Sequence, residues 1–377
     1  MKMRWAIGLS AALCASVASA APTIDKAWTS DGRTATAKAV EIGLPLQAGT
    51  FEGRALRDLG TAGADLIAQY ETHDTKVIGT IFLYAASRPD IGLTFLATDQ
   101  TIRARLRPDV TVVEDQLIPI NGVANAGRRV VYEGKADAKL TGDFDGRVYS
   151  TATLFRAADW IVVVRATGPV SRSTEISQGL DALVAGIVLG KKVRPFPTAK
   201  IAVEACAPSP ARSDVDVTSP PMSEAIEAML ALNSMADDAG SVMANPLLGR
   251  IDRVCLERSE RMGQGPLLTY RVLNPSDGTL NPRLVMLHGD AGTMLLALES
   301  KKHPGEYFIA RHAIGTTYII GRTPSLPSTT QLQAILGHPD NQPAVVVMKN
   351  DYLSDPKSQQ ININCSLTAE GCDKGKK

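Results

Sequence analysis

The sequence contains none of the short motifs that mark the common nucleophile, nucleotide and metalloprotease sites. It has no G-x-S-x-G nucleophile elbow, no phosphate-binding loop of the G-x-x-x-x-G-K-[ST] type, no H-E-x-x-H pair and no G-x-G-x-x-G after a predicted strand. These absences argue against the best-marked hydrolase and nucleotide-dependent classes. They leave open an enzyme whose site is assembled from scattered residues.

Excess charge of one sign and aromatic residues are also scarce. The chain of 377 residues has 40 basic and 39 acidic residues, and Phe, Trp and Tyr make up 5% of it. General binding to nucleic acid or to a membrane surface relies on a basic footprint, so we expect neither partner. The few aromatics also argue against a stacking platform for sugars or bases, and Trp160 is expected in the core.

Residues 1–20 have the three parts of a secretory signal peptide. Lys2 and Arg4 form a positive n-region, Trp5–Val17 is an apolar segment too short to span a bilayer, and Ala18–Ala20 is a small-residue cleavage site. No later apolar run reaches membrane-spanning length. We therefore expect cleavage after Ala20 and a mature protein that is periplasmic or secreted, with no stable membrane span.

Cysteine is rare, and the predicted export decides which cysteines the mature chain keeps. Cys14 leaves with the signal peptide, while Cys206, Cys255, Cys365 and Cys372 remain in the second half of the chain. Four cysteines in an oxidising compartment predict two disulfides with three possible pairings, of which we favour Cys206–Cys255 and Cys365–Cys372. The sequence argues against zinc or a catalytic thiol, because no cysteine pair has close zinc-ligand spacing and no cysteine adjoins a histidine.

The first half of the chain is organised around residues 146–192. Two β-rich runs joined by a short polar turn predict a hairpin, and the second run, Trp160–Thr167, is apolar on both faces, which predicts a central strand. An apolar stripe from Ile176 to Ile187 predicts a helix beginning at Ser173. The other elements expected before Gly190 are strands at 51–59, 64–71, 76–85, 110–118 and 128–133, a helix at 93–106 and an extended lead-in at 21–39.

The order of these elements over residues 40–190 is β-β-β-α-β-β-β-β-α, which predicts an antiparallel sheet with two helices. With a strand ending at Tyr84, a meander through Arg147–Arg165 and a closing helix, this order resembles the PsbP/Mog1/DcrB group of α/β/α sandwiches. The resemblance implies a sandwich fold. It also implies an accessory or adaptor role, since members of that group are mostly not enzymes.

Residues 191–218 are rich in proline and predict a semi-rigid linker, and residues 219–367 predict a second α+β domain. The fold class expected is therefore α+β, with two domains that each pack helices on a largely antiparallel sheet, and a flexible tail at 368–377. In the second domain we expect a helix from Ser219 to about Ala239, strands at 250–258, 267–273, 283–287, 292–299, 307–310, 316–321 and 344–349, and a helix at 328–336 that Ser328 and Gln331 begin with a capping box.

Four of the five histidines fall within about fifty residues, at His288, His303, His312 and His338. His288 ends an apolar strand two residues before Asp290, a pair that suits a divalent metal or acid–base catalysis. The competing interpretation is a set of surface-turn histidines, because His303 and His338 each precede a proline. A metal site requires His288, Asp290 and a third histidine within ligand distance of one another.

Arginines also cluster, at Arg103, Arg105, Arg107, Arg128 and Arg129. Guanidinium groups suit phosphate or carboxylate partners, yet alternate residues on a helix do not share a face, so a solvated surface is the competing interpretation.

The loop Thr323–Ser328 leads into a capped helix start, which can hold an anion or serve as a plain connection. The function that these observations favour is an exported, non-catalytic accessory or binding protein for an unknown periplasmic protein or small ligand, with no cofactor or metal predicted. The alternative is a hydrolase or metal-dependent enzyme around His288 and Asp290.

The signal peptide gives a direct prediction about the mature chain. Protein recovered from the periplasm or medium should begin at Ala21, because cleavage follows Ala20. Intact mass spectrometry without reductant measures both the new N-terminus and the loss of four hydrogens to two disulfides. A mass that retains residues 1–20 and four free thiols contradicts export.

Overall fold

The computed structural model describes most of the chain after residue 21. The predicted signal peptide, Cys365, Cys372 and the tail 368–377 lie outside the described residues. The described residues are 22–60, 62–86, 90–106, 109–135, 146–208, 211–233, 251–262, 265–274, 276–289, 293–300, 302–337, 344–350 and 359–364.

The first large sheet contains nine strands in the order β1-β6-β7-β8-β12-β11-β10-β9, with β5 paired to β6. All neighbouring strands are antiparallel except β1 and β6. From β6 to the helix α3, the element order matches the predicted one. The elements are β1 (Thr23–Ile24), β5 (Gln47–Ala48), β6 (Phe51–Asp58), β7 (Asp65–Thr72), β8 (Ile78–Ala85), α1 (Ile91–Arg105), β9 (Thr111–Ile120), β10 (Val123–Lys135), β11 (Arg147–Ala157), β12 (Trp160–Pro169), a 3-10 turn (Val170–Arg172) and α3 (Ser173–Ala185).

Strand β12 is central and buried on both faces, as its sequence predicts. It pairs with β11 on one side and β8 on the other. Val162 and Val164 belong to the core under α3, where Leu180 also packs, and Ile161 and Val163 belong to the core under α1. Successive side chains on a strand point to opposite faces, so a continuous apolar run is required where helices cover both.

The expectation that residues 21–39 form only an extended lead-in is wrong. Strands β2 (Trp28–Ser30) and β3 (Thr34–Ala37) join β4 (Ile42–Pro45) and β13 (Val188–Leu189) in a small antiparallel sheet. Trp28, Ala35 and Ala37 are buried in the core under α3. The alternation of threonine and alanine in β3 has the right period, but alanine is too small to produce a strong hydrophobic signal.

The second large sheet is a nine-stranded meander, β14 to β22 in sequence order. Only the pairing of β14 with β15 is parallel within it. Helix α4 packs on one face and helix α5 on the other. The elements are β14 (Ala202–Ala205), α4 (Met222–Asn233), β15 (Arg253–Met262), β16 (Gly265–Leu273), β17 (Leu280–His288), β18 (Thr293–Glu299), β19 (Tyr307–Ala313), β20 (Thr316–Thr323), α5 (Thr329–Gly337), β21 (Val346–Asn350) and β22 (Gln359–Ile363).

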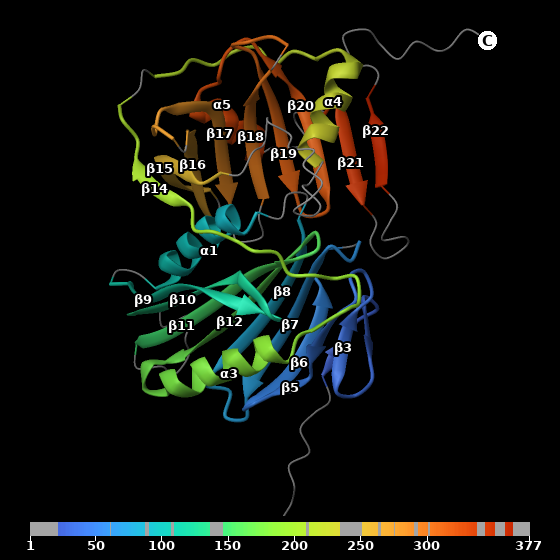
Figure 1. Ribbon diagram of the computed structural model, residues 1–377, viewed down its shortest axis with the longest axis vertical. Helices are drawn as coiled ribbons and strands as arrows, with labels where there is room; N and C mark the ends of the chain where they lie inside the picture. The colour runs from blue at the N-terminus through green and yellow to red at the C-terminus, as the bar shows by residue number, and fades with distance from the viewer. Residues whose placement is uncertain are drawn as a thin grey trace, which may run out of the picture.

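Helix α1 lies between the two large sheets (Figure 1). Phe95 and Ile102 pack on the first sheet, whereas Leu93 and Leu96 pack on the second. Asp90 caps the helix by accepting a hydrogen bond from the Leu93 backbone N–H at 3.0 Å. A helix that is apolar around most of its circumference must be covered on several sides. The α+β class is thus confirmed, with four α-helices among the described residues.

The described part of the predicted linker packs against the sheets. The Thr198 N–H donates to the Asn125 carbonyl at 2.8 Å. Ile201 is buried against α1, where a Cβ on Gly92 would lie 2.6 Å from the Ile201 Cγ1, so glycine permits this close approach. The two sheets also meet directly, because the Gly315 N–H donates to the Ala85 carbonyl at 2.8 Å.

The shared core predicts a large effect from truncating α1 on its second-sheet side. Leu93 is fully buried, so Leu93→Ala should lower the free energy of unfolding by about 2–5 kcal/mol. The matched control is Leu59→Ala, whose side chain is 57% exposed and which should change it by less than about 0.5 kcal/mol. Urea unfolding followed by circular dichroism measures both. Equal midpoints for the two variants contradict the packing of α1 on the second sheet.

Candidate functional site

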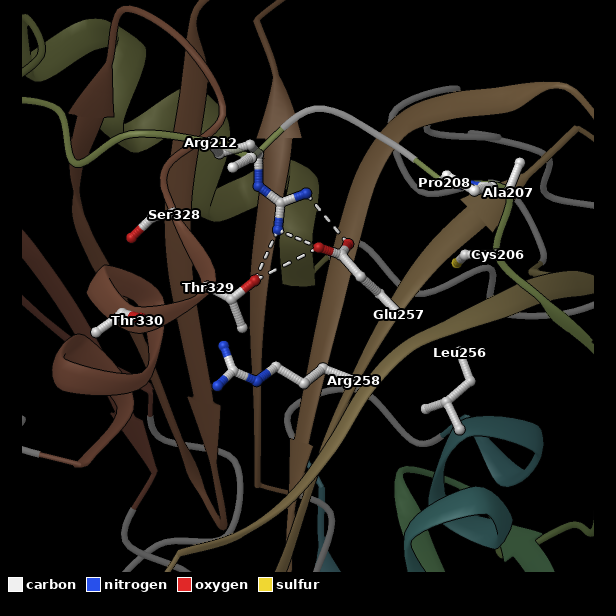
Figure 2. Close-up of a pocket in the computed structure, with 11 residues that line it drawn as sticks. Cys206, Ala207, Pro208, Arg212, Leu256, Glu257, Arg258, Ser328, Thr329 and Thr330 are labelled. Carbon is white, nitrogen blue, oxygen red and sulfur yellow. Dashed lines mark hydrogen bonds and ion pairs between the residues drawn. The ribbon is translucent and has the colours of Figure 1, made fainter.

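A cavity of about 400 Å³ lies between the end of the predicted linker, strand β15 and the start of helix α5. It brings together three segments that are far apart in the sequence (Figure 2). We call it the β15–α5 pocket. Its lining residues are Cys206, Ala207, Pro208, Ala211, Arg212, Leu256, Glu257, Arg258, Ser328, Thr329 and Thr330.

One wall of the pocket is fixed by a disulfide. Cys206 follows β14 and is bonded to Cys255 of β15, with the two Cα atoms 4.8 Å apart. This pairing agrees with the predicted one. The bond joins residues 49 positions apart, and closing such a loop stabilises a folded chain by about 4 kcal/mol in the chain-entropy account.

Arg212 holds the same wall by a second connection. Its Nη2 donates to the Glu257 Oε1 at 2.7 Å and its Nη1 to the Oε2 at 3.1 Å, which is a bidentate pair. The guanidinium also donates to the Pro327 carbonyl at 2.9 Å and to the Thr329 Oγ1 at 2.8 Å. Figure 2 shows the bonds of Arg212 to Glu257 and Thr329. Arg212 therefore links the linker, β15 and the loop before α5.

The start of α5 forms the facing wall. The Ser328 Oγ accepts from the Gln331 N–H at 3.0 Å, so Ser328 is the N-cap, as predicted. The second half of the expected capping box is wrong. The Gln331 side chain turns away and bonds both the N–H and the carbonyl of Val215 at 3.0 and 2.6 Å, because that linker backbone offers it a donor and an acceptor. Ser328 also bonds Asp214.

Arg258 supplies the exposed cation of the pocket. Its side chain is 48% exposed and pairs with Glu260 on the same strand. In Figure 2 it extends from β15 toward Thr329 and Thr330 at the helix start. Arg271 also lies 3.6 Å from Glu257. The three guanidinium groups in and around the pocket are thus matched by the carboxylates of Glu257, Glu260 and Asp214, so Arg258 attracts an anion as a local, half-exposed cation and not through a net positive charge of the pocket.

The structure separates the predicted histidine cluster. In the pairing of β17 with β18, His288 is opposite Thr293. In the pairing of β18 with β19, His312 is opposite Met294. Directly opposed residues share a face and successive residues alternate, so His288 and His312 point to opposite faces of the sheet. The His288 Nδ1 lies 3.3 Å from the Pro266 carbonyl, while the buried His312 Nδ1 lies 3.1 Å from the Thr317 Oγ1.

The other members of that cluster do not complete a site in the part of the chain that the structure describes. His303 lies 3.3 Å from Glu224 of α4, and Asp290 and His338 are outside the described residues. No group of three or more His, Cys, Asp or Glu side chains among the described residues is placed to hold a metal ion. The pairing of His288 with Asp290 stays a prediction.

The predicted arginine cluster is divided between separate carboxylate partners. Arg103 bonds Asp99 at 2.8 Å on α1, Arg128 bonds Asp115 at 3.0 and 2.9 Å, and Arg129 bonds Asp181 of α3. Burial raises the pKa of Asp115, but Arg128 and Lys200 together outweigh it and hold that pKa below its usual range. Arg128 and Arg129 lie on opposite faces of β10, and Arg107 lies outside the described residues.

Comparison with known proteins adds little. No protein-family model and no curated protein matches the chain. Among solved structures, the chain is similar to the solution structure of cyanobacterial PsbP (CyanoP) from Synechocystis sp. PCC 6803, with 11% identity over 40% of this chain and 86% of that chain. The TM-score is 0.27, a level that carries no argument about function. None of the described helices has the length and apolar composition needed to cross a membrane.

The Arg212 network predicts unequal effects from two arginine substitutions. Arg212→Ala should lower the free energy of unfolding by about 2 kcal/mol, because it leaves the half-buried Glu257 carboxylate without its bidentate partner. Arg258→Ala, at a half-exposed side chain, should cost less than about 1 kcal/mol. Thermal or urea unfolding of the two variants checks this. A larger loss of unfolding free energy for Arg258→Ala than for Arg212→Ala contradicts the structural role of Arg212.

Proposed function

We propose that this chain is an exported, non-catalytic binding or accessory protein that holds a small anionic ligand in the β15–α5 pocket. It has two domains, residues 40–190 and 219–367, each centred on one of the large, mainly antiparallel sheets. The observation that carries the proposal is the pocket itself, where a disulfide, a bidentate ion pair and a helix start converge.

Export is supported by two independent features. Residues 1–20 have the composition of a secretory signal peptide. The Cys206–Cys255 bond belongs to the oxidising compartments in which disulfides persist, which include the periplasm and the extracellular space. A periplasmic or secreted location follows from both.

The anionic character of the ligand follows from the lining groups. Arg258 is a half-exposed guanidinium, and guanidinium groups match carboxylate and phosphate in a bidentate geometry. The hydroxyl of Thr330 and the first backbone N–H groups of α5 add donors at the positive end of a helix dipole, whereas the Thr329 hydroxyl is engaged by Arg212 and Glu257. The carboxylate of Glu257 is held by Arg212, so it is engaged in structure. This arrangement suits the binding of a small anion.

Titration with inorganic phosphate and a panel of small mono- and dicarboxylates tests the proposal. On the mature, oxidised protein at low salt, calorimetry should detect saturable binding of at least one of them. Arg258→Ala should weaken it by about tenfold or more, the loss expected for one charge-assisted hydrogen bond or more.

The matched control is Arg261→Ala, which removes an exposed arginine of the same strand that does not line the pocket. It should leave the affinity within about twofold. Saturable binding to none of these anions overturns the proposal, and equal losses for the two variants place the ligand outside the pocket.

A further inference from the structure

The wall of the β15–α5 pocket is attached to β15 at two points. Cys206 is bonded to Cys255, and Arg212 is paired with Glu257 two residues further along the same strand. Cys206–Pro208 and Ala211–Arg212 line the pocket between these points. The position of this wall relative to β15 therefore depends on one covalent and one ionic connection, and Arg212 also ties it to the loop before α5.

Between Ile201, which is buried against α1, and the disulfide, the chain entering this wall is weakly held. Strand β14 has only four residues, all exposed, and pairs in parallel with β15 at the edge of the sheet. The ion pair of its Glu204 with Arg253, at 2.6 Å, is partly solvent-exposed. Short parallel edge pairing and surface ion pairs contribute little stability, so such segments open locally.

The two cysteine residues differ in exposure. Cys255 is 2% exposed, whereas Cys206 is half-buried and lines the pocket. Attack on a disulfide requires access to one sulfur and departure of the other as a thiolate. Cys206 is thus the less buried half of the disulfide and the one that faces the pocket.

We propose that the Cys206–Cys255 disulfide is a redox-controlled closure of the β15–α5 pocket, which holds its ligand when the bond is formed and releases it when the bond is reduced. The reductant is a dithiol protein. Its thiolate attacks the Cys206 Sγ to form a mixed disulfide, and Cys255 leaves as a thiolate and takes up a proton. The second thiol of the reductant then releases Cys206 as a thiol. Two electrons and two protons pass to the cysteines, and the reductant becomes a disulfide.

Arg212 makes the closure reversible. Its bonds to Glu257, Thr329 and the Pro327 carbonyl do not depend on the disulfide. After reduction these bonds keep Arg212 beside Glu257 of β15. The nearby Cys206 thiol therefore cannot move far from the Cys255 thiol. An oxidant can then restore the original pair.

Hydrogen exchange measured by mass spectrometry tests the closure without any ligand. The comparison is between the oxidised mature protein and the double variant Cys206→Ala, Cys255→Ala, which leaves any other disulfide intact. Exchange should accelerate at least tenfold in peptides covering residues 202–208 and 253–256, and it should be unchanged in peptides of β18 and β19. Arg212→Ala in the oxidised protein should leave residues 202–206 protected.

Equal exchange of the wall in the two proteins overturns the proposal. Faster exchange throughout the molecule also overturns it, because the bond is then a general brace of the fold.

The release of ligand rests on the proposed function, so phosphate and the carboxylates are titrated in parallel. Affinity for the anion that binds should fall at least tenfold in the double variant. Local loosening with no anion bound in either state rejects the proposed ligand and keeps the redox closure. Unchanged affinity with local loosening overturns the control of binding by the disulfide.

Discussion

The packing of helix α1 on two opposite sides is the interaction on which the architecture depends. Leu93 and Leu96 complete the core of the second sheet, while Phe95 and Ile102 complete that of the first. One edge of the helix remains for polar groups, where Asp99 accepts from the Tyr132 hydroxyl at 2.7 Å. Helix α1 completes one apolar face of each large sheet, so the two sheets are energetically coupled although their strands are contributed by separate halves of the chain.

Local patterns predicted much of the fold. The hairpin of β11 and β12, the two-sided burial of β12 and the order of elements from β6 to α3 follow from apolar period and turn residues. Two features of the fold were not predicted from the sequence. The sequence predicts a helix at 93–106, but nothing local shows that this helix is covered from two directions. The small sheet around Trp28 escaped because threonine and alanine alternate there with little contrast in hydrophobicity.

The pocket was less accessible to sequence reasoning than the fold. Its only local signal was the capped helix start at Ser328. Arg212 and Glu257 are 45 residues apart and meet because the β14–β15 pairing and the Cys206–Cys255 bond bring the linker against β15. Nearness in sequence was also misleading for the histidines, since the period of two along β-strands sends His288 and His312 to opposite faces. Side chains converge through strand register, which no single segment encodes.

The disulfide has a further consequence for the covalent continuity of the molecule. It closes a ring that runs from Cys206 through helix α4 to Cys255. A protease that cuts the chain once at any point within this ring produces two fragments that remain bonded through sulfur. Such a nicked molecule keeps its full mass under non-reducing electrophoresis, and the break becomes visible only when a thiol is added.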